Sequence, residues 1–331
     1  THTLGTETVP QRWRGLVSGL VGGGGAGLGA VIASLVFLAV SSAFPGPAFD
    51  EWGWRVMFFT GLLASLASLA FFRLLEESPV WAAAARARAT AAVPEQPVRA
   101  RDLVSAVTPR TLVASTALVI GAGAQYYLTS GYLPTFLDKI NQLPTGPRGL
   151  LLVWTSLAIL PMALLAGHAS ERFGRRPVFL AIGAVNLVAL PLLALAMGGL
   201  GPDDTGALLG YGLLITVLAN ASYAAVPIFL NELFPTRLRA TATALIWNGG
   251  FALGGLTTTF VSLASPTVAD IPGRLALFLV AVVAVFLLGA AFVPETRGAL
   301  DRDDPHDDPH DDLRAPAAPA DRPGTLPGGP R

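Results

Sequence analysis

Eight apolar stretches, each about 20 residues or longer, constrain this chain of 331 residues more than any other feature. They lie at 16–43, 54–74, 112–137, 149–168, 177–199, 206–231, 241–264 and 274–294. A helix needs about 20 mostly apolar residues to cross the hydrocarbon core of a bilayer, so the pattern predicts eight transmembrane helices. Only 13% of the residues are charged and the mean hydropathy is +0.57, which excludes a water-soluble globular protein. The expected fold class is an all-α, multi-pass membrane protein.

The segments between the stretches differ in positive charge. One alternating set (1–15, 73–110, 169–176, 235–240 and 295–331) carries 18 of the 22 Lys and Arg residues. Cytoplasmic loops of membrane proteins carry this excess. The sequence therefore predicts a protein of the plasma (inner) membrane with both termini in the cytoplasm.

Two segments of the chain repeat one another. "ETVPQRWRG" (7–15) precedes the first stretch and "ELFPTRLRA" (232–240) precedes the seventh, and both share the spacing E-x-x-P-x-R-x-R. Stretches one and two thus match stretches seven and eight in the same orientation, as in transporters built from two similar halves. Within the second half, the third to sixth stretches precede the copy, whereas no stretch precedes the first copy. We therefore expect a fold of twelve helices from which the first four are missing by N-terminal truncation.

Four regions follow from these patterns. They are a partial N-terminal bundle of two helices (1–75), a cytoplasmic central loop (76–111), a C-terminal six-helix bundle (112–294) and a cytoplasmic tail (295–331). The tail is acidic, rich in proline and nearly free of large apolar residues, so it cannot bury enough surface to fold. Its doubled "DDPH" therefore favours a solvated, disordered segment over a metal site.

A dense group of charges interrupts the apolar pattern between the fourth and fifth stretches. The segment "GHASERFGRRP" (167–177) begins with the pattern G-x-x-x-E-R-x-G-R-R. It resembles the cytoplasmic loop signature of the major facilitator superfamily, where Asp usually stands in place of Glu171. The resemblance implies the major facilitator fold in incomplete form, with the last two helices of the N-terminal bundle and the six-helix C-terminal bundle.

Further segments agree with this resemblance along most of the chain. They are "RWRG", "WGWR", "ESP", "FPTRLRA" and "PETRG", in the family's order. Two longer segments, "GAQYYLTSGYLPTFL" (123–137) and "NELFPTRLRATATALIWNGGFALGG" (231–255), are most similar to the metabolite:proton symporters of the superfamily. Sugar porters are the near neighbour.

The charges and glycines of residues 167–176 suggest a conformational latch. A carboxylate at a helix end can pair with arginines of a neighbouring element, and glycines permit a tight turn and close helix approach. The alternative is that the arginines only follow the positive-inside bias, which leaves Glu171 and the glycines unexplained. The two repeated segments invite the same argument. The expected latch residues are Gly167, Glu171, Arg172, Gly174, Arg175, Arg176, Glu232, Arg237, Arg239, Glu7, Arg12 and Arg14.

Polar side chains inside the expected helices indicate a substrate pathway, because they are rare in membrane spans and usually face a cavity. In the third and sixth stretches they recur at helical spacing on one face. Such a face can donate hydrogen bonds to a carboxylate or a zwitterion. The alternative is that these groups only bond to neighbouring helices. The expected pathway residues are Gln125, Tyr126, Tyr127, Thr129, Tyr132, Asn220, Tyr223, Trp247 and Asn248.

Together these features predict a secondary active transporter of a small polar metabolite, either an organic acid or a zwitterion. Alternating access and proton-coupled symport are the expected mechanism. No stretch holds a carboxylate in its interior, so we expect the coupling acid in the missing helices. The alternative is that Glu232 or His168, at the inner ends of the helices, serves in its place. Two alternatives stay open: another major facilitator carrier such as a sugar porter, and a non-transporting membrane sensor or inactive truncated product.

An enzyme is not expected from this sequence. The chain has no cysteine, no G-x-S-x-G segment and no phosphate-binding loop. We expect a monomer that works in the lipid bilayer on a small-molecule substrate, without a nucleic-acid partner. The proton is the expected coupling ion, and no further cofactor or metal is expected.

Overall fold

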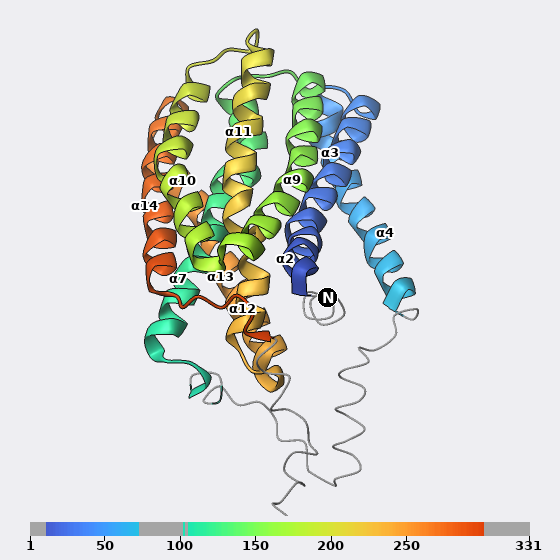
Figure 1. Ribbon diagram of the computed structural model, residues 1–331. Coiled ribbons are helices and arrows are strands. Elements are labelled where there is room, and N and C mark those ends of the chain that lie inside the picture. The colour runs from blue at the N-terminus through green and yellow to red at the C-terminus, as the bar shows by residue number, and fades with distance from the viewer. Residues whose placement is uncertain (1–10, 73–101, 103–104, 301–331) are drawn as a thin grey trace, which may run out of the picture.

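The computed structural model describes residues 11–72, 102 and 105–300, and these residues form helices joined by short connections (Figure 1). The all-α architecture expected from the sequence is confirmed. Most of the expected central loop and the tail from residue 301 lie outside the described residues, as does Glu7.

The first two apolar stretches form a helical pair, which we call the N-terminal pair. Its first member consists of α2 (Gln11–Gly19), a single π-helical turn η1 (Leu20–Gly24) and α3 (Gly25–Ala43). A second π-helical turn, η2 (Phe49–Gly53), leads into α4 (Trp54–Phe72). The run of glycines at 22–25 explains the irregular turn, because glycine holds a regular helix less firmly than other residues do.

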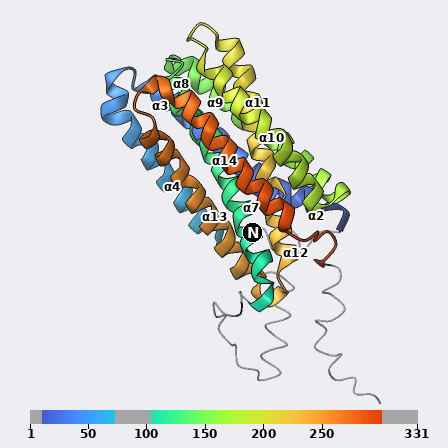
Figure 2. The same ribbon diagram turned by 90° about the vertical axis from the view of Figure 1, so that its left-hand side faces the viewer.

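The remaining stretches form a bundle of six spans, which we call the C-terminal bundle. In chain order its elements are α7 (Pro109–Tyr126), η3 (Tyr127–Gly131), α8 (Leu133–Lys139), α9 (Thr145–Phe173), α10 (Arg175–Gly198), α11 (Thr205–Ala224), α12 (Val226–Leu233), α13 (Thr236–Ala264), η4 (Val268–Asp270) and α14 (Ile271–Phe292). Figure 2 shows α13 running alongside α7 and α14, and residue contacts join these three helices.

Seven of the described helical segments are long and apolar enough to cross a membrane. They correspond to seven of the eight expected stretches. The exception is the stretch at 241–264, which forms α13, a helix of 29 residues. This helix is long enough to span, but threonines, glycines and Asn248 dilute its apolar character. Its polarity bears on the pathway described below.

Two spans of the C-terminal bundle are broken near their middle. In the third span α7 passes into the π-helical turn η3, and Pro134 then opens α8. In the sixth span α11 ends at Ala224 and Pro227 opens α12. Proline lacks the N–H that would continue the helical hydrogen bonds, so a break is expected at these positions. Both breaks lie beside residues expected to form the substrate pathway.

The connections fall at two ends of the molecule (Figure 1). The Gly174 end, at the bottom of Figure 1, holds the start of α2, the turn from α9 to α10 and the residues after α14. The opposite end, which we call the Gly201 end, holds the turns from α3 to α4 and from α10 to α11. The positively charged set of segments described by the structure therefore lies at one end, as the alternation of loops requires.

The N-terminal pair packs against α9 of the C-terminal bundle through small residues. A Cβ added at Gly19 would lie 2.4 Å from the Ala163 carbonyl oxygen, and one at Gly27 would lie 3.0 Å from the Ile159 Cβ. Further along, the hydroxyl oxygens of Ser34 and Ser156 are 3.5 Å apart. Only small side chains let helix backbones approach this closely.

Candidate functional site

The guanidinium of Arg175 forms the centre of a charged cluster at the Gly174 end. It is fully buried, and its Nε and Nη2 donate to the two carboxylate oxygens of Glu232, over 2.9 and 2.8 Å. Nη2 also donates to Glu171 Oε2 at 2.8 Å, and Nη1 donates to Ser170 Oγ at 2.9 Å. Paired, fork-like contacts of this kind are the strongest that arginine makes. We refer to Glu171, Arg175, Glu232 and Glu295 as the charged cluster.

Glu295 completes the cluster from a distant part of the chain. Its carboxylate accepts hydrogen bonds from the backbone N–H groups of Arg175 and Arg176, at 2.9 and 3.0 Å. These are the first N–H groups of α10, which have no partner within the helix, so Glu295 acts as its cap. The neighbouring Thr296 donates to Glu232 Oε2 at 2.8 Å and is itself buried.

Gly174 makes this arrangement possible. Its φ of 99° lies in the region that other residues rarely adopt, and it separates α9 from α10. A Cβ at Gly174 would lie 2.6 Å from Glu295 Oε2. The glycine therefore serves both the turn and the approach of the capping carboxylate.

The cluster also reaches the N-terminal pair. The backbone N–H of Gly15 in α2 donates to Glu171 Oε2 at 3.1 Å. Gly15 and Gly167 pack backbone to backbone, because a Cβ added at Gly167 would lie 2.3 Å from the Gly15 carbonyl oxygen. Glu171 is therefore the side chain through which the charged cluster touches the other part of the molecule.

The structure does not bring every expected latch residue into this cluster. The side chain of Arg172 is exposed and lies over the Phe173 ring, with 5.5 Å from its central carbon to the ring centroid. Arg176 is exposed and donates to the Ala291 carbonyl. Arg239 is buried but donates to the Asn231 carbonyl, and Arg14 lies half-buried on α2. Glu7 and the side chains of Arg12 and Arg237 lie outside the described residues.

The cluster member Glu295 and its neighbour Thr296 were not among the expected latch residues. Glu295 and Thr296 belong to the quoted "PETRG" segment but were assigned to the disordered tail expected from residue 295. Residues 295–300 instead pack against the bundle, where Leu300 is buried and Arg297 donates to the Arg172 carbonyl at 2.7 Å. The boundary of the expected tail is therefore too early by these residues.

Four of the expected pathway residues form buried polar contacts within and between the third, fifth and sixth spans. Gln125 is fully buried, and its Oε1 accepts a hydrogen bond from Asn186 of α10 at 2.8 Å. Thr129 donates to the Gln125 carbonyl at 2.7 Å. The Tyr223 hydroxyl donates to Asn220 Oδ1 at 2.7 Å, and Asn220 donates in turn to Ser130 at 2.7 Å. Two of these bonds, Asn186 to Gln125 and Asn220 to Ser130, join neighbouring spans, as the helix-to-helix alternative expects.

Asn186 was missed, although the argument from polar residues in spans applies to it. It lies in the middle of α10 in the run "AIGAVNLVALPLL" and is fully buried. Besides Gln125 it donates to the Leu218 carbonyl of α11 at 3.0 Å. It therefore ties three helices together.

Three further expected residues, Tyr126, Tyr127 and Trp247, form a second group with Tyr223 and Phe251. The rings of Tyr126 and Tyr127 are 5.2 Å apart, and Tyr126 lies 5.9 Å from Tyr223. Trp247 stacks on Phe251 with centroids 4.5 Å apart. We call these five side chains from α7, η3, α11 and α13 the aromatic cluster. Four of its rings are partly exposed and only Tyr223 is buried.

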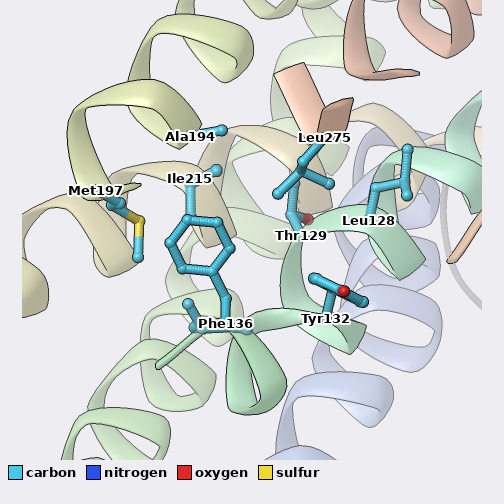
Figure 3. Close-up of a pocket in the computed structure, with 9 residues that line it drawn as sticks. Leu128, Thr129, Tyr132, Phe136, Ala194, Met197, Ile215 and Leu275 are labelled. Carbon is cyan, nitrogen blue, oxygen red and sulfur yellow. The ribbon is translucent and has the colours of Figure 1, made fainter. Parts of the chain in front are cut away.

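Asn248 and Tyr132 lie apart from these two groups. Asn248 is exposed on α13, and its amide donates to the Ala244 carbonyl of the same helix. Tyr132 and Thr129 line a small pocket of mainly apolar side chains, including Phe136 and Met197 (Figure 3). Its volume of about 10 Å³ is the space of a single water molecule, which is too small for a metabolite.

Comparison with known families divides the chain into two matching parts. Residues 145–323 match the profile described as "Major Facilitator Superfamily". Residues 3–105 match the profile described as "Sugar (and other) transporter". The first match covers more than half of the chain.

Individual relatives belong to the same group of membrane proteins. The chain is 26% identical to a proline/betaine transporter of Salmonella typhimurium, over 77% of this chain and 51% of the relative. It is 28% identical to a glycine betaine/proline/ectoine/pipecolic acid transporter of Dickeya dadantii, over 88% and 58%. It is 26% identical to the inner membrane metabolite transport protein YhjE of Escherichia coli, over 89% and 66%. The chain thus spans about half to two thirds of these relatives, and it belongs to the major facilitator superfamily.

Proposed function

We propose that the protein is a secondary active transporter of a small polar metabolite, an organic acid or a zwitterion, that works by alternating access. The observation that carries this proposal is that aromatic and polar side chains from three spans meet near mid-span. Two of these spans, the third and the sixth, are broken, and the other is the polar helix α13. Tyr126 lies near the middle of the segment Pro109–Lys139, and Trp247 lies near the middle of α13. Relatives named for proline, betaine and other metabolites support a solute of this class.

The charged cluster is proposed as the latch of this transporter. Arg175, Glu232 and Glu295 join parts of the C-terminal bundle only, so they form a rigid base. Glu171 also accepts the Gly15 N–H, which belongs to the N-terminal pair. When the two parts separate at the Gly174 end, that bond is lost while the paired contact of Arg175 with Glu232 persists. By the positive-inside rule this end faces the cytoplasm, as do both termini.

Proton coupling is proposed for this transporter, with the titrating group outside the described residues. Within the part of the chain that the structure describes, no carboxylate lies near the middle of a membrane span. Glu232 is the deepest candidate at the Gly174 end, but Arg175 and Thr296 occupy both of its oxygens. Proton-coupled carriers need a titratable group on the pathway. We therefore place it in another part of the working protein, which we take to act as a monomer in the lipid bilayer.

Uptake by vesicles tests the transport proposal. We expect reconstituted protein to take up at least one labelled solute from a panel of zwitterions, organic acids and sugars in a saturable manner. An inward proton gradient should raise the initial rate, because symport couples solute entry to proton entry. The same vesicles with the gradient collapsed by an ionophore are the control.

Three outcomes would overturn parts of this proposal. Saturable binding of a solute without uptake would favour a membrane sensor. Uptake restricted to sugars would favour the sugar-porter alternative, and uptake that is insensitive to the gradient would remove proton symport.

A further inference from the structure

The rings of the aromatic cluster are held together by one side chain that the sequence analysis did not single out. Phe251 contacts the other four rings, with centroid distances of 6.2 Å to Tyr126, 6.3 Å to Tyr127, 5.8 Å to Tyr223 and 4.5 Å to Trp247. Most of these pairs are edge-to-face, so the rings stand at steep angles to one another. Such an arrangement turns ring faces in several directions.

Glycines set the cluster in place by bringing α7 and α13 together. A Cβ added at Gly254 would lie 2.6 Å from the Ala124 backbone nitrogen, and one at Gly123 would lie 3.1 Å from the Phe251 Cα. Tyr127 packs beside Gly255, at 3.4 Å from an added Cβ. Close contact of the two backbones therefore carries the tyrosines of one helix against the rings of the other.

The exposed side of α13 beside the cluster combines polar and small residues with the exposed side chains of Leu245 and Leu253. Next to Trp247 the outer surface of α13 presents Asn248 and Gly249, and α13 is the one long described helix that falls short of the apolarity of a span. A helix face turned to lipid avoids an amide at mid-depth, because polar groups there are costly. Ring faces on this side are thus open to a solute.

Two polar groups beside the rings, the Tyr223 hydroxyl and the Asn220 amide, are already paired. The Tyr223 hydroxyl donates to Asn220, and the Asn220 amide donates to Ser130 and to the Thr216 carbonyl. Beyond these two groups, the cluster offers a solute the faces of its rings and the hydroxyls of Tyr126 and Tyr127. Aromatic faces carry partial negative charge, so they attract a cation and repel a carboxylate.

Charged side chains of the described residues lie away from the cluster. In the described residues, arginines, lysines and carboxylates of the long helices lie near the two ends of the molecule and not at the level of Tyr126 and Trp247. Among the residues that the structure describes, none at this level is an acid that could neutralise an ammonium ion. The attraction between a desolvated cation and ring faces is then the available source of binding energy.

We propose that the aromatic cluster binds the alkylated ammonium group of the transported solute, so that the substrate is an ammonium zwitterion and not a simple organic acid. This inference rests on the proposed transport function and narrows its substrate class. The quaternary ammonium lies against the rings of Trp247, Phe251 and Tyr126. Its carboxylate points away from the cluster.

Binding of two isosteric probes to the full chain in detergent tests the charge requirement. Glycine betaine carries a trimethylammonium group, and 3,3-dimethylbutanoate has the same shape with a neutral carbon in place of the nitrogen. We expect glycine betaine to bind at least about tenfold more tightly, because only the cation gains from the ring faces. Equal affinity of the two probes, or tighter binding of the butanoate, would overturn the proposal.

Variants at two rings locate the site. Trp247→Leu and Phe251→Leu should each weaken glycine betaine binding by about tenfold or more, and Trp247→Phe should retain most of the affinity. Phe260→Leu is the matched control, because Phe260 lies on the same helix and is 51% exposed. Unchanged glycine betaine affinity in both leucine variants would show that the ammonium binds elsewhere.

The outcomes separate this inference from the proposed function. Saturable binding of an organic acid or a sugar, without binding of glycine betaine, leaves a carrier whose substrate is not an ammonium zwitterion. Failure to bind any solute of the panel contradicts the proposed function itself.

Discussion

Replacing Arg175 with Met is expected to lower the free energy of unfolding by about 3–5 kcal/mol. The guanidinium is fully buried, and the Glu232 carboxylate that it neutralises is almost fully buried as well, with 2% of its side chain exposed. Removing the arginine leaves this carboxylate without its partner in a place that water does not reach. The free energy can be measured by unfolding in mixed detergent micelles with increasing sodium dodecyl sulfate.

Two matched variants show whether the loss comes from the unpaired charge. Arg172→Met removes an arginine from the same segment, but one that is exposed, so the change should stay within about 0.5 kcal/mol. Adding Glu232→Gln to Arg175→Met should recover part of the lost stability, because the buried charge is then gone. A large effect at Arg172, or a double variant less stable than Arg175→Met alone, would contradict the assignment of Arg175 as the centre of the cluster.

Gly167→Leu is expected to separate the N-terminal pair from α9 and to destabilise the protein by about 1–3 kcal/mol. Even a Cβ at this position would lie 2.3 Å from the Gly15 carbonyl oxygen, so the two backbones have to move apart. The chain has no cysteine, so Ser34→Cys and Ser156→Cys introduce the only two thiols. Their parent hydroxyl oxygens are 3.5 Å apart, and oxidative cross-linking between them reports the packing of α3 on α9.

Gly29→Leu provides the control for this experiment. Gly29 lies on the same pair of helices, and an added Cβ there meets no atom within 4 Å. Its cross-linking yield and stability should match those of the parent with the two cysteines. If Gly167→Leu also cross-links at the parent yield, the close approach at Gly15 is not what holds the pair against the bundle.

The sequence contained enough information for the spans and for the centre of the charged cluster. The length of an apolar stretch can be read directly from the local sequence. Seven of the eight predicted spans accordingly appear as long apolar helices. Glu171, Arg175 and Glu232 belonged to short segments whose charges are unusual in an apolar chain. Local composition cannot reveal which arginine becomes buried. That choice depends on Gly174, whose positive φ makes Arg175 the first residue of α10 and leaves Arg172 on the exposed end of α9.

Contacts between distant parts of the chain lay beyond sequence reasoning. Glu295 caps α10 from a position 120 residues later, and no local pattern pairs these two segments. Phe251 is one phenylalanine among many in apolar stretches, and its packing against four other rings is visible only once α7 and α13 are adjacent. Asn186 is different, because a buried amide within an apolar run follows from the rule for polar residues in spans.

The central claim is that the two parts of the molecule separate at the Gly174 end during transport and that Glu171 holds them together beforehand. Spin labels at Leu20 on η1 and Leu165 on α9 report the distance between the two parts toward this end. Both side chains are exposed, so a label can replace them without disturbing the packing. Labels at Leu35 and Trp154, which are exposed on α3 and α9, report positions nearer the Gly201 end.

Pulsed electron–electron distance measurements on reconstituted protein test this claim most directly. We predict two populations of distances for the Leu20–Leu165 pair, and Glu171→Gln should raise the share of the longer one. In the same variant the Leu35–Trp154 distance should become shorter. A single Leu20–Leu165 distance that neither solute nor Glu171→Gln changes would contradict the account.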